Sequence, residues 1–190
     1  MGNSADSIIL GCWVTFFVYW VTSALKVKAI AEKQSLGSVL RHRIPIGLSW
    51  FLLAFQGRLP SPLNSHFTPR TRFTQILGAA ICLVGLFVTV WARRTLAGNW
   101  SSDVTFKQNH ELIQAGPYRF ARHPIYTGLL VMCLGTTVDV GRARTWLAVV
   151  VMLIGFWIKL RQEETLLRRH FPDAYPAYQK QVKALVPLLL

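Results

Sequence analysis

The sequence predicts an all-α polytopic membrane protein, with about five transmembrane helices and a C-terminal helical extension in the cytoplasm. Apolar residues make up 52% of the 190 residues and charged residues only 15%, whereas soluble domains carry about a quarter charged residues. The mean hydropathy is positive, at +0.35. Several apolar runs approach the ~20 residues that a helix needs to cross the hydrocarbon core.

The first apolar run, Ser7 to Leu25, is uncharged and long enough to span. No basic segment precedes it and no small-x-small site closely follows it, so we expect an uncleaved anchor rather than a signal peptide. The second run, Ile44 to Leu59, is shorter and ends in a polar interruption at 56–58. The third run, Phe73 to Trp91, is long and contains no charged residue. The proline-containing stretch 56–69 before it is expected to be a loop.

The fourth and fifth runs, Ile125 to Val140 and Thr145 to Leu160, are separated only by Gly141 to Arg144. A connection this short joins antiparallel neighbours, so we expect a helical hairpin over 125–160. Phe171 and Pro172 should end the last membrane helix, and a further helix is expected over Tyr175 to Leu185.

The distribution of charge supports this map. The chain carries 21 Lys and Arg against 8 Asp and Glu, a formal net charge of +13. With five crossings and the N-terminus outside, the segments 26–43, 93–124 and 159–190 face inward and hold sixteen of the basic residues. The positive-inside rule then places these three segments, and with them the C-terminus, in the cytoplasm. Because the charge is spread over helix ends, nucleic-acid binding is not expected.

Metal binding is not expected either. The three cysteines, Cys12, Cys82 and Cys133, lie far apart within apolar runs and show neither metal-ligand nor disulfide spacing. Buried, inert thiols are therefore predicted.

The segment 109–128 reads NHELIQAGPYRFARHPIYTG. Its Gly-Pro pair at 116–117 predicts a turn, and Pro124 suits the first turn of the following helix. Arg122 and His123 would then stand at a helix N-terminus, where free N–H groups and the helix dipole favour an anion. The alternative is that the arginines and tyrosines of this segment are interfacial anchors.

The second informative segment extends from Arg161 to Pro187. Helical spacing puts Arg161, Glu164 and Arg168 on one face, where they could form ion pairs of the weak, solvated kind. Glu163 and Glu164 lie within one turn of the apolar run, and acidic residues at that level of a membrane protein tend to be functional.

Together these segments resemble the isoprenylcysteine carboxyl methyltransferases and phospholipid methyltransferases, small integral membrane enzymes that use S-adenosylmethionine. The resemblance covers residues 99–187, and the first three spans match only in hydrophobicity. The family pattern is met by His110, Leu112, Gly116, Tyr118, Arg122, His123, Pro124, Tyr126, Gly128, Glu163, Glu164, Leu167, Phe171, Tyr175, Tyr178 and Pro187.

The resemblance implies one integral membrane methyltransferase domain over residues 1–190. Residues 1–92 would form three N-terminal spans, and residues 93–190 the cofactor-binding half. The expected cofactor-binding residues are the nine from His110 to Gly128 in that pattern together with the two glutamates: His110, Leu112, Gly116, Tyr118, Arg122, His123, Pro124, Tyr126, Gly128, Glu163 and Glu164. The expected catalytic residues are Arg161, Glu163, Glu164 and His123.

The chemistry of S-adenosylmethionine agrees with this choice of residues. Arg122, His123 and the helix start suit its carboxylate, Glu163 or Glu164 suits its ammonium or ribose hydroxyls, and the tyrosines suit the sulfonium or the adenine. The expected partners are membrane lipids and a lipophilic or lipidated acceptor. An isoprenylcysteine carboxylate, a phospholipid amine, a thiol and a small lipophilic metabolite all stay open as the acceptor.

Two other functions compete. Membrane sterol reductases, which bind NADPH, look similar in this region, but their pattern has Asn between Pro and Tyr and a later Arg-Asp-Glu run. This chain has Pro124-Ile125-Tyr126 and Arg161-Gln162-Glu163-Glu164 instead. A non-catalytic membrane protein on the same scaffold is the other alternative. A soluble Rossmann-type methyltransferase is excluded, since no G-x-G-x-x-G loop follows a strand.

Overall fold

The computed structural model describes residues 4–24, 30–33, 35–55, 57, 59–100, 105–107 and 111–185. Within these residues the regular secondary structure is helical, apart from one short strand pair and an isolated bridge between His66 and Arg142. The helices are α1 (Ser4–Ala24), α2 (Leu36–Ala54), α3 (Arg72–Leu96), α4 (Pro124–Val140), α5 (Ala143–His170) and α6 (Ala174–Gln181), with 3-10 turns η1 (Ala97–Asn99) and η2 (Gly116–Arg119). Strands β1 (Ile30–Lys33) and β2 (Thr105–Lys107) pair antiparallel.

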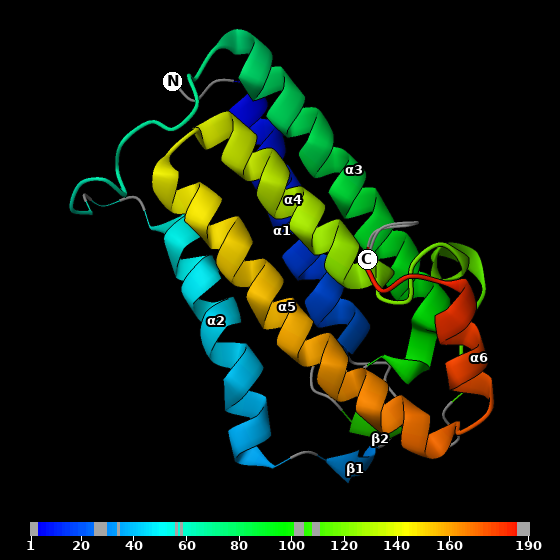
Figure 1. Cartoon of the computed structure of the whole chain (residues 1–190). Coiled ribbons are helices and arrows are strands. Elements are labelled where there is room, and N and C mark those ends of the chain that lie inside the picture. Colours follow the sequence, from blue (N-terminus) through cyan, green and yellow to red (C-terminus); the bar gives the residue numbers. More distant parts are fainter. Residues whose placement is uncertain are drawn as a thin grey trace.

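The five long helices form one bundle. In Figure 1, α2, α5, α4 and α3 lie side by side in this order, and α1 lies behind them. Contacts between the helices give their directions. Asp6 near the start of α1 meets Arg70 just before α3, and Ser23 at the end of α1 meets Arg93 at the end of α3, so α1 and α3 run in the same direction. Early residues of α3 lie against late residues of α4, which makes these two helices antiparallel. The start of α2 likewise meets the end of α5, and the end of α2 meets the start of α5. Successive helices therefore alternate in direction. We call the end where α4 begins and α5 finishes the site end, and the other the far end.

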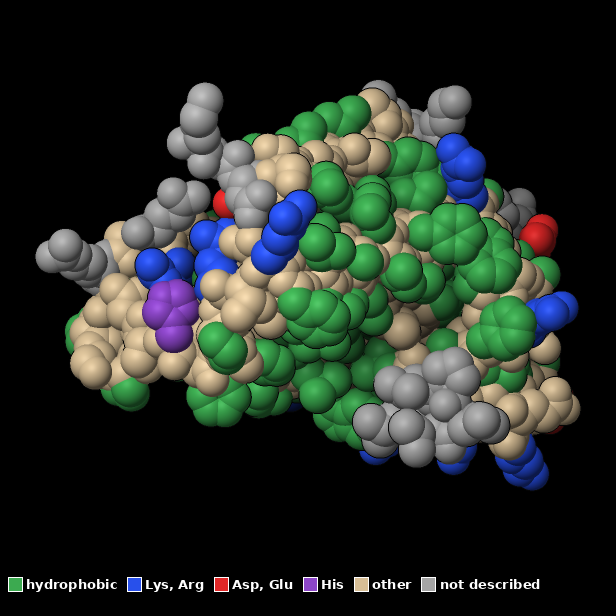
Figure 2. All heavy atoms as spheres, turned by 90° about the horizontal axis from the view of Figure 1, so that it is seen from above, with side chains coloured by type: hydrophobic (Ala, Val, Ile, Leu, Met, Phe, Trp, Pro, Cys, Tyr) green, Lys and Arg blue, Asp and Glu red, His purple; other side chains and the backbone are tan. Residues whose placement is uncertain are grey.

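Among the described residues, three helices are long and apolar enough to cross a membrane: Ser4–Ala24, the continuous helical stretch Arg72–Asn99, and Ala143–His170. The apolar α4 is shorter, at 17 residues. Large apolar side chains on α1, α3 and α5 are exposed, among them Val18, Phe87 and Val150. Figure 2 shows hydrophobic side chains gathered over the middle of one face, with Lys and Arg side chains toward its edges. This pattern is typical of a protein surrounded by lipid.

The predicted boundaries of the second span were wrong. Instead of Ile44 to Leu59, α2 runs from Leu36 to Ala54. It begins early because the Ser35 hydroxyl accepts a hydrogen bond from the Ser38 N–H and caps the helix. The basic residues before Ile44, which predicted a loop, are exposed on the first turns of the helix. The hairpin over 125–160 is confirmed, with Gly141 in the left-handed conformation at φ 68°. The last helix ends at Gln181 rather than Leu185.

The helices α3 and α4 pack with their backbones in contact. A Cβ atom on Gly135 would lie 2.5 Å from the Cys82 nitrogen, and one on Gly128 would lie 2.2 Å from the Thr89 hydroxyl. Cys82 and Cys133 are fully buried in this seam, and all three cysteines are free, as predicted. Gly128, which the resemblance implied as a cofactor-binding residue, therefore has a packing role.

Two arginines that the sequence placed among loop charges are buried at helix C-termini. Arg93 donates to the carbonyl of Ala97 at 2.7 Å and to that of Ser23 at 2.8 Å, which joins the ends of α3 and α1. Arg144 donates to the carbonyls of Leu52 and Phe55 at the end of α2. A cation at a helix C-terminus satisfies carbonyls that lack intrahelical partners and interacts favourably with the helix dipole.

Candidate functional site

The site forms where the start of α4 meets the end of α5. The chain turns through Gly116, at φ 59°, and η2, and it then enters α4 with His123 as the residue before the helix and Pro124 as its first residue. Proline fits this position because its missing N–H would have no intrahelical partner. The C-terminal segment lies against this helix start, since the N–H groups of Arg122 and His123 donate to the carbonyls of Lys183 and Ala184, both at 2.9 Å.

His123 joins the two glutamates of α5. Its Nδ1 atom lies 3.5 Å from Oε2 of Glu163, and its Nε2 atom lies 3.3 Å from Oε1 of Glu164. The His123 side chain is buried, with 7% of its surface exposed. An imidazole can donate from both nitrogens at once only when it carries the positive charge. The geometry therefore suits an imidazolium between two carboxylates.

Glu164 is buried among donors. Arg122 approaches its Oε1 atom with Nε at 2.9 Å and Nη2 at 2.8 Å, and Gln179 of α6 donates to its Oε2 atom at 2.8 Å. Arg168, one turn further along α5, lies 3.8 Å away. This carboxylate ties α4, α5 and α6 together.

Glu163 has a different environment. Its side chain is 22% exposed, against 4% for Glu164. The Tyr126 hydroxyl donates to it at 2.5 Å, and the Lys159 ammonium lies 3.9 Å away. The ring of Tyr126 stacks between those of His123 and Phe156, at centroid distances of 5.5 Å and 4.7 Å. Glu163 thus stands beside an aromatic stack and reaches the surface of the protein.

Electrostatics at the site follow from burial and from the two carboxylates. Burial alone would lower the pKa of His123, but the hydrogen bonds and negative charges of Glu163 and Glu164 outweigh it, so that pKa is raised above its usual value. Burial raises the pKa of Tyr178 to about 12. Burial and then the negative charge of Glu164 raise the pKa of Tyr175. Both tyrosines on α6 therefore keep their hydroxyl protons at neutral pH.

The structure brings together five of the predicted site residues: Arg122, His123, Tyr126, Glu163 and Glu164. Pro124 begins the helix beneath them. Tyr118 is buried close by, where its carbonyl accepts a hydrogen bond from the Tyr178 hydroxyl.

Other predicted residues lie apart from this group. Leu112 is half-buried before the turn, and Gly116 packs near Thr95 and Trp91. Arg161 is exposed and pairs with no described acidic residue. Of the two ion pairs that the helical spacing allowed, only the one between Glu164 and Arg168 is present among the described residues. His110 lies outside the described residues.

The expectation that the helix start offers N–H groups to an anion needs correction. The N–H groups of Arg122 and His123 are paired with the C-terminal segment, and that of Tyr126 donates to the His123 carbonyl at 3.0 Å. The Arg122 guanidinium is likewise engaged by Glu164 and by the Val182 carbonyl.

Sequence reasoning missed Lys159 and Gln179 as members of the site. Lys159 could have been found, because it stands four residues before Glu163 and both therefore share a helix face. Gln179 gave no comparable signal, since it reaches Glu164 only after the chain reverses between α5 and α6.

Comparison with known proteins assigns this arrangement to a family. The chain matches the profile described as phospholipid methyltransferase over residues 73–174, which is more than half of its length. The chain belongs to the phospholipid methyltransferase family. The match includes α3, so the prediction that the first three spans resemble the family only in hydrophobicity was wrong for the third.

Curated relatives are isoprenylcysteine methyltransferases. The chain is 28% identical over 120 residues to the probable protein-S-isoprenylcysteine O-methyltransferase of Oryza sativa subsp. indica, covering 62% of this chain and 63% of that protein. It is 32% identical over 112 residues to the Schizosaccharomyces pombe protein-S-isoprenylcysteine O-methyltransferase, covering 57% and 47%. The Xenopus laevis protein of the same name is 24% identical over 187 residues, covering 94% and 62%.

Family membership favours the methyltransferase expectation over the reductase alternative and implies a methyl donor. With its apolar helices, it makes this an integral membrane protein. The matched segments span less than two thirds of these relatives' own lengths. Among the described residues, no group of three or more His, Cys, Asp and Glu side chains is placed to hold a metal ion.

Proposed function

We propose that this protein transfers the methyl group of S-adenosylmethionine to the carboxylate of a membrane-embedded isoprenylcysteine. The observation that carries the proposal is the cluster in which His123 joins Glu163 and Glu164 at the end of the apolar helices α4 and α5. A polar methyl donor and an apolar acceptor meet most readily at such a boundary between water and hydrocarbon. The names of the relatives support the choice of acceptor.

The residues of the site fit S-adenosylmethionine by their chemistry. Glu163, whose carboxylate is partly exposed, suits the ammonium group, and the stacked rings of Tyr126 and His123 lie beside it. The Tyr175 hydroxyl is buried and has no hydrogen-bond partner among the described residues. A buried hydroxyl of this kind is available as a donor to the carboxylate of the cofactor. Arg122 holds Glu164 and the C-terminal segment in place.

When bound, S-adenosylmethionine supplies a methyl group activated by the sulfonium charge. The protein contributes position, since holding two reactants together can by itself lower a barrier by several kcal/mol, on the order of 7–11 in well-oriented systems. The two carboxylates raise the pKa of His123 and so favour its protonated form, which cannot accept a proton. An acceptor that arrives as a carboxylate needs no base and gains nucleophilicity as water is excluded. This favours a carboxylate over an amine or a thiol.

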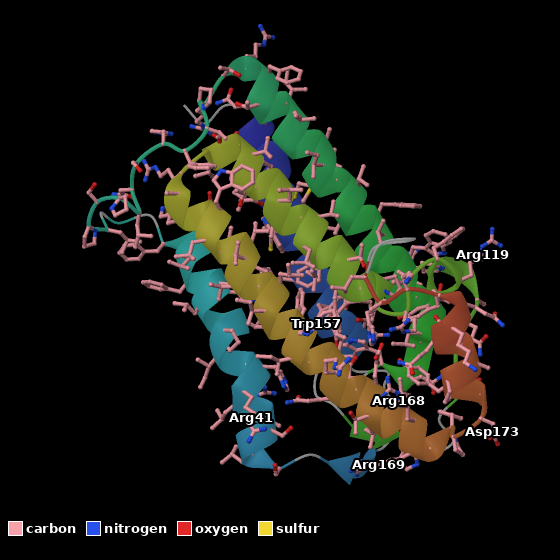
Figure 3. The ribbon with its side chains drawn as sticks, in the orientation of Figure 1. Arg41, Arg119, Trp157, Arg168, Arg169 and Asp173 are labelled. Atoms are coloured by element: carbon pink, nitrogen blue, oxygen red, sulfur yellow. The ribbon has the colours of Figure 1, made fainter. Side chains whose placement is uncertain are left out.

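Five crossings and a cytoplasmic site complete the proposal. The alternating directions of α1 to α5 support it, because each helix then crosses once and the site end gathers the basic segments. Arg41, Arg168 and Arg169 lie toward this end in Figure 3.

The test is transfer of label from S-adenosylmethionine to lipid acceptors by the purified protein in lipid nanodiscs. We expect label in the organic extract with farnesylcysteine and little with an amine or thiol of equal tail length. Glu163→Gln should weaken cofactor binding by about 1–3 kcal/mol, the usual effect of losing a hydrogen bond to a charged group. Arg169→Gln, at an exposed residue of α5, is the matched control. Reduction of a sterol by NADPH without methyl transfer would overturn the proposal.

A further inference from the structure

A buried histidine on α2 contacts the residue next to the glutamate pair. His42 is 1% exposed, although Arg41 and Arg43 on either side of it are exposed. Its Nδ1 atom lies 2.9 Å from Oε1 of Gln162 on α5, and the Gln162 amide nitrogen donates to the Ser38 carbonyl at 3.1 Å. An amide oxygen only accepts, so Nδ1 of His42 carries the proton and donates it. Gln162 therefore makes two hydrogen bonds to the first turns of α2.

These bonds hold α5 from the side opposite the site. Successive residues of a helix are turned by about 100°, so Gln162 points toward α2 while Glu163 and Glu164 point toward His123 and α6. The end of α5 is thus held by polar contacts on both sides.

Packing alone does not explain a histidine at this place. Elsewhere α2 and α5 join through close packing, as where Ile46 lies against Gly155, and through the hydrogen bond from the Ser49 hydroxyl to the Ala148 carbonyl at 2.7 Å. A buried imidazole costs free energy unless it is hydrogen-bonded, and an apolar residue would fill the same space without that cost. Hydrogen bonds are directional, however, and they set the rotation of a helix where apolar packing tolerates small shifts.

We infer that His42 and Gln162 are positioning residues, which set the rotation of α5 so that Glu163 and Glu164 both reach His123. This inference rests on the proposed function in one respect, since the kinetic test of it measures the rate of methyl transfer. His42 lies outside the segment matched by the family profile and Gln162 lies inside it, so this contact links the N-terminal part of the chain to the matched segment.

Removing either side chain tests the inference by kinetics. His42→Leu and Gln162→Met keep the volume but lose the hydrogen bonds, and each should lower kcat about tenfold while KM for the acceptor changes less than twofold. The double variant should be no slower than the worse single variant, since both remove the same contact. His42→Asn places an amide N–H near the Nδ1 position and should restore at least half of kcat. Arg41→Gln, on the exposed neighbouring residue, is the matched control.

A second readout is independent of activity. The nitrogen NMR signals of the His123 imidazole, recorded in the whole protein, should shift in His42→Leu and Gln162→Met and return toward the wild-type positions in His42→Asn. If His42→Leu fails to fold, Gln162→Met carries both measurements. Unchanged kcat and unchanged His123 signals in Gln162→Met would overturn the inference. Shifted signals in a protein that transfers no methyl group would support the positioning role while contradicting the proposed function.

Discussion

Arg122 and Glu164 form a buried ion pair, with Nη2 of the arginine 2.8 Å from Oε1 of the glutamate. The two residues are 42 positions apart in the chain, and their contact ties the start of α4 to the end of α5. The Glu164 carboxylate also contacts the His123 imidazole and accepts a hydrogen bond from the Gln179 amide, so it joins three segments of the site. The Glu163 side chain, in contrast, is partly exposed. The adjacent carboxylates therefore have different roles.

The first prediction separates these two glutamates. Glu164→Gln should lower the stability of the protein by about 3–5 kcal/mol at most, because it leaves the buried Arg122 charge without its partner. Glu163→Gln should change stability much less and reduce cofactor affinity instead. Thermal unfolding and calorimetric titration with S-adenosylmethionine measure the two effects. Equal losses of stability in both variants would contradict this division of roles.

The second prediction concerns pH. Folding raises the pKa of His123, because the hydrogen bonds and charges of Glu163 and Glu164 outweigh the effect of burial. Its contribution to stability is fully present below the unfolded pKa of about 6.5 and is lost as pH rises through the higher folded value. The midpoint of thermal unfolding should fall over that range in the wild type. His123→Gln should lack this step, while His66→Gln, at an exposed histidine of the far end, should retain it.

The third prediction tests the seam between α3 and α4. Gly135→Ala should lower the free energy of unfolding by about 1–3 kcal/mol, because the added Cβ would overlap the backbone at Cys82. Gly11→Ala on α1 is the control, since a Cβ there meets no atom within 4 Å. It should be neutral or stabilising, by up to about 1 kcal/mol. Chemical denaturation in detergent compares the two, and equal stability of both variants would count against a tight seam.

The fourth prediction concerns topology. Reporter fusions after Lys33 and after Gln179 should both report the cytoplasm, since both positions lie at the site end with most of the basic residues. A reporter inserted within residues 61–68, in the far-end loop, should report the opposite side. A non-cytoplasmic signal after Gln179 would reverse the orientation proposed for the site.

The sequence by itself determined the membrane class, the helical hairpin and five of the residues that the structure brings together, but not Lys159 or Gln179. Long apolar runs predict helices that face lipid, because a polar or charged side chain in the hydrocarbon core costs several kcal/mol of free energy. The order Arg122-His123-Pro124 and the Glu163-Glu164 pair were recognisable because they match the family pattern in residue type and in short spacing. The predicted start of the second helix was wrong because residues 36–43, which form its first turns, include basic and polar side chains. In a sequence such residues next to an apolar run are typical of a loop.

Only the tertiary structure decided which of these residues meet. The pairing of His123 with both glutamates, the use of Arg122 by Glu164 rather than by an anion, and the contact of His42 with Gln162 all join segments far apart in the chain. Periodicity reports which way a side chain points from its own helix, but not the partner it finds there. That partner depends on how closely the helices approach, which at the seam between α3 and α4 is set by glycines, the residues with no side chain.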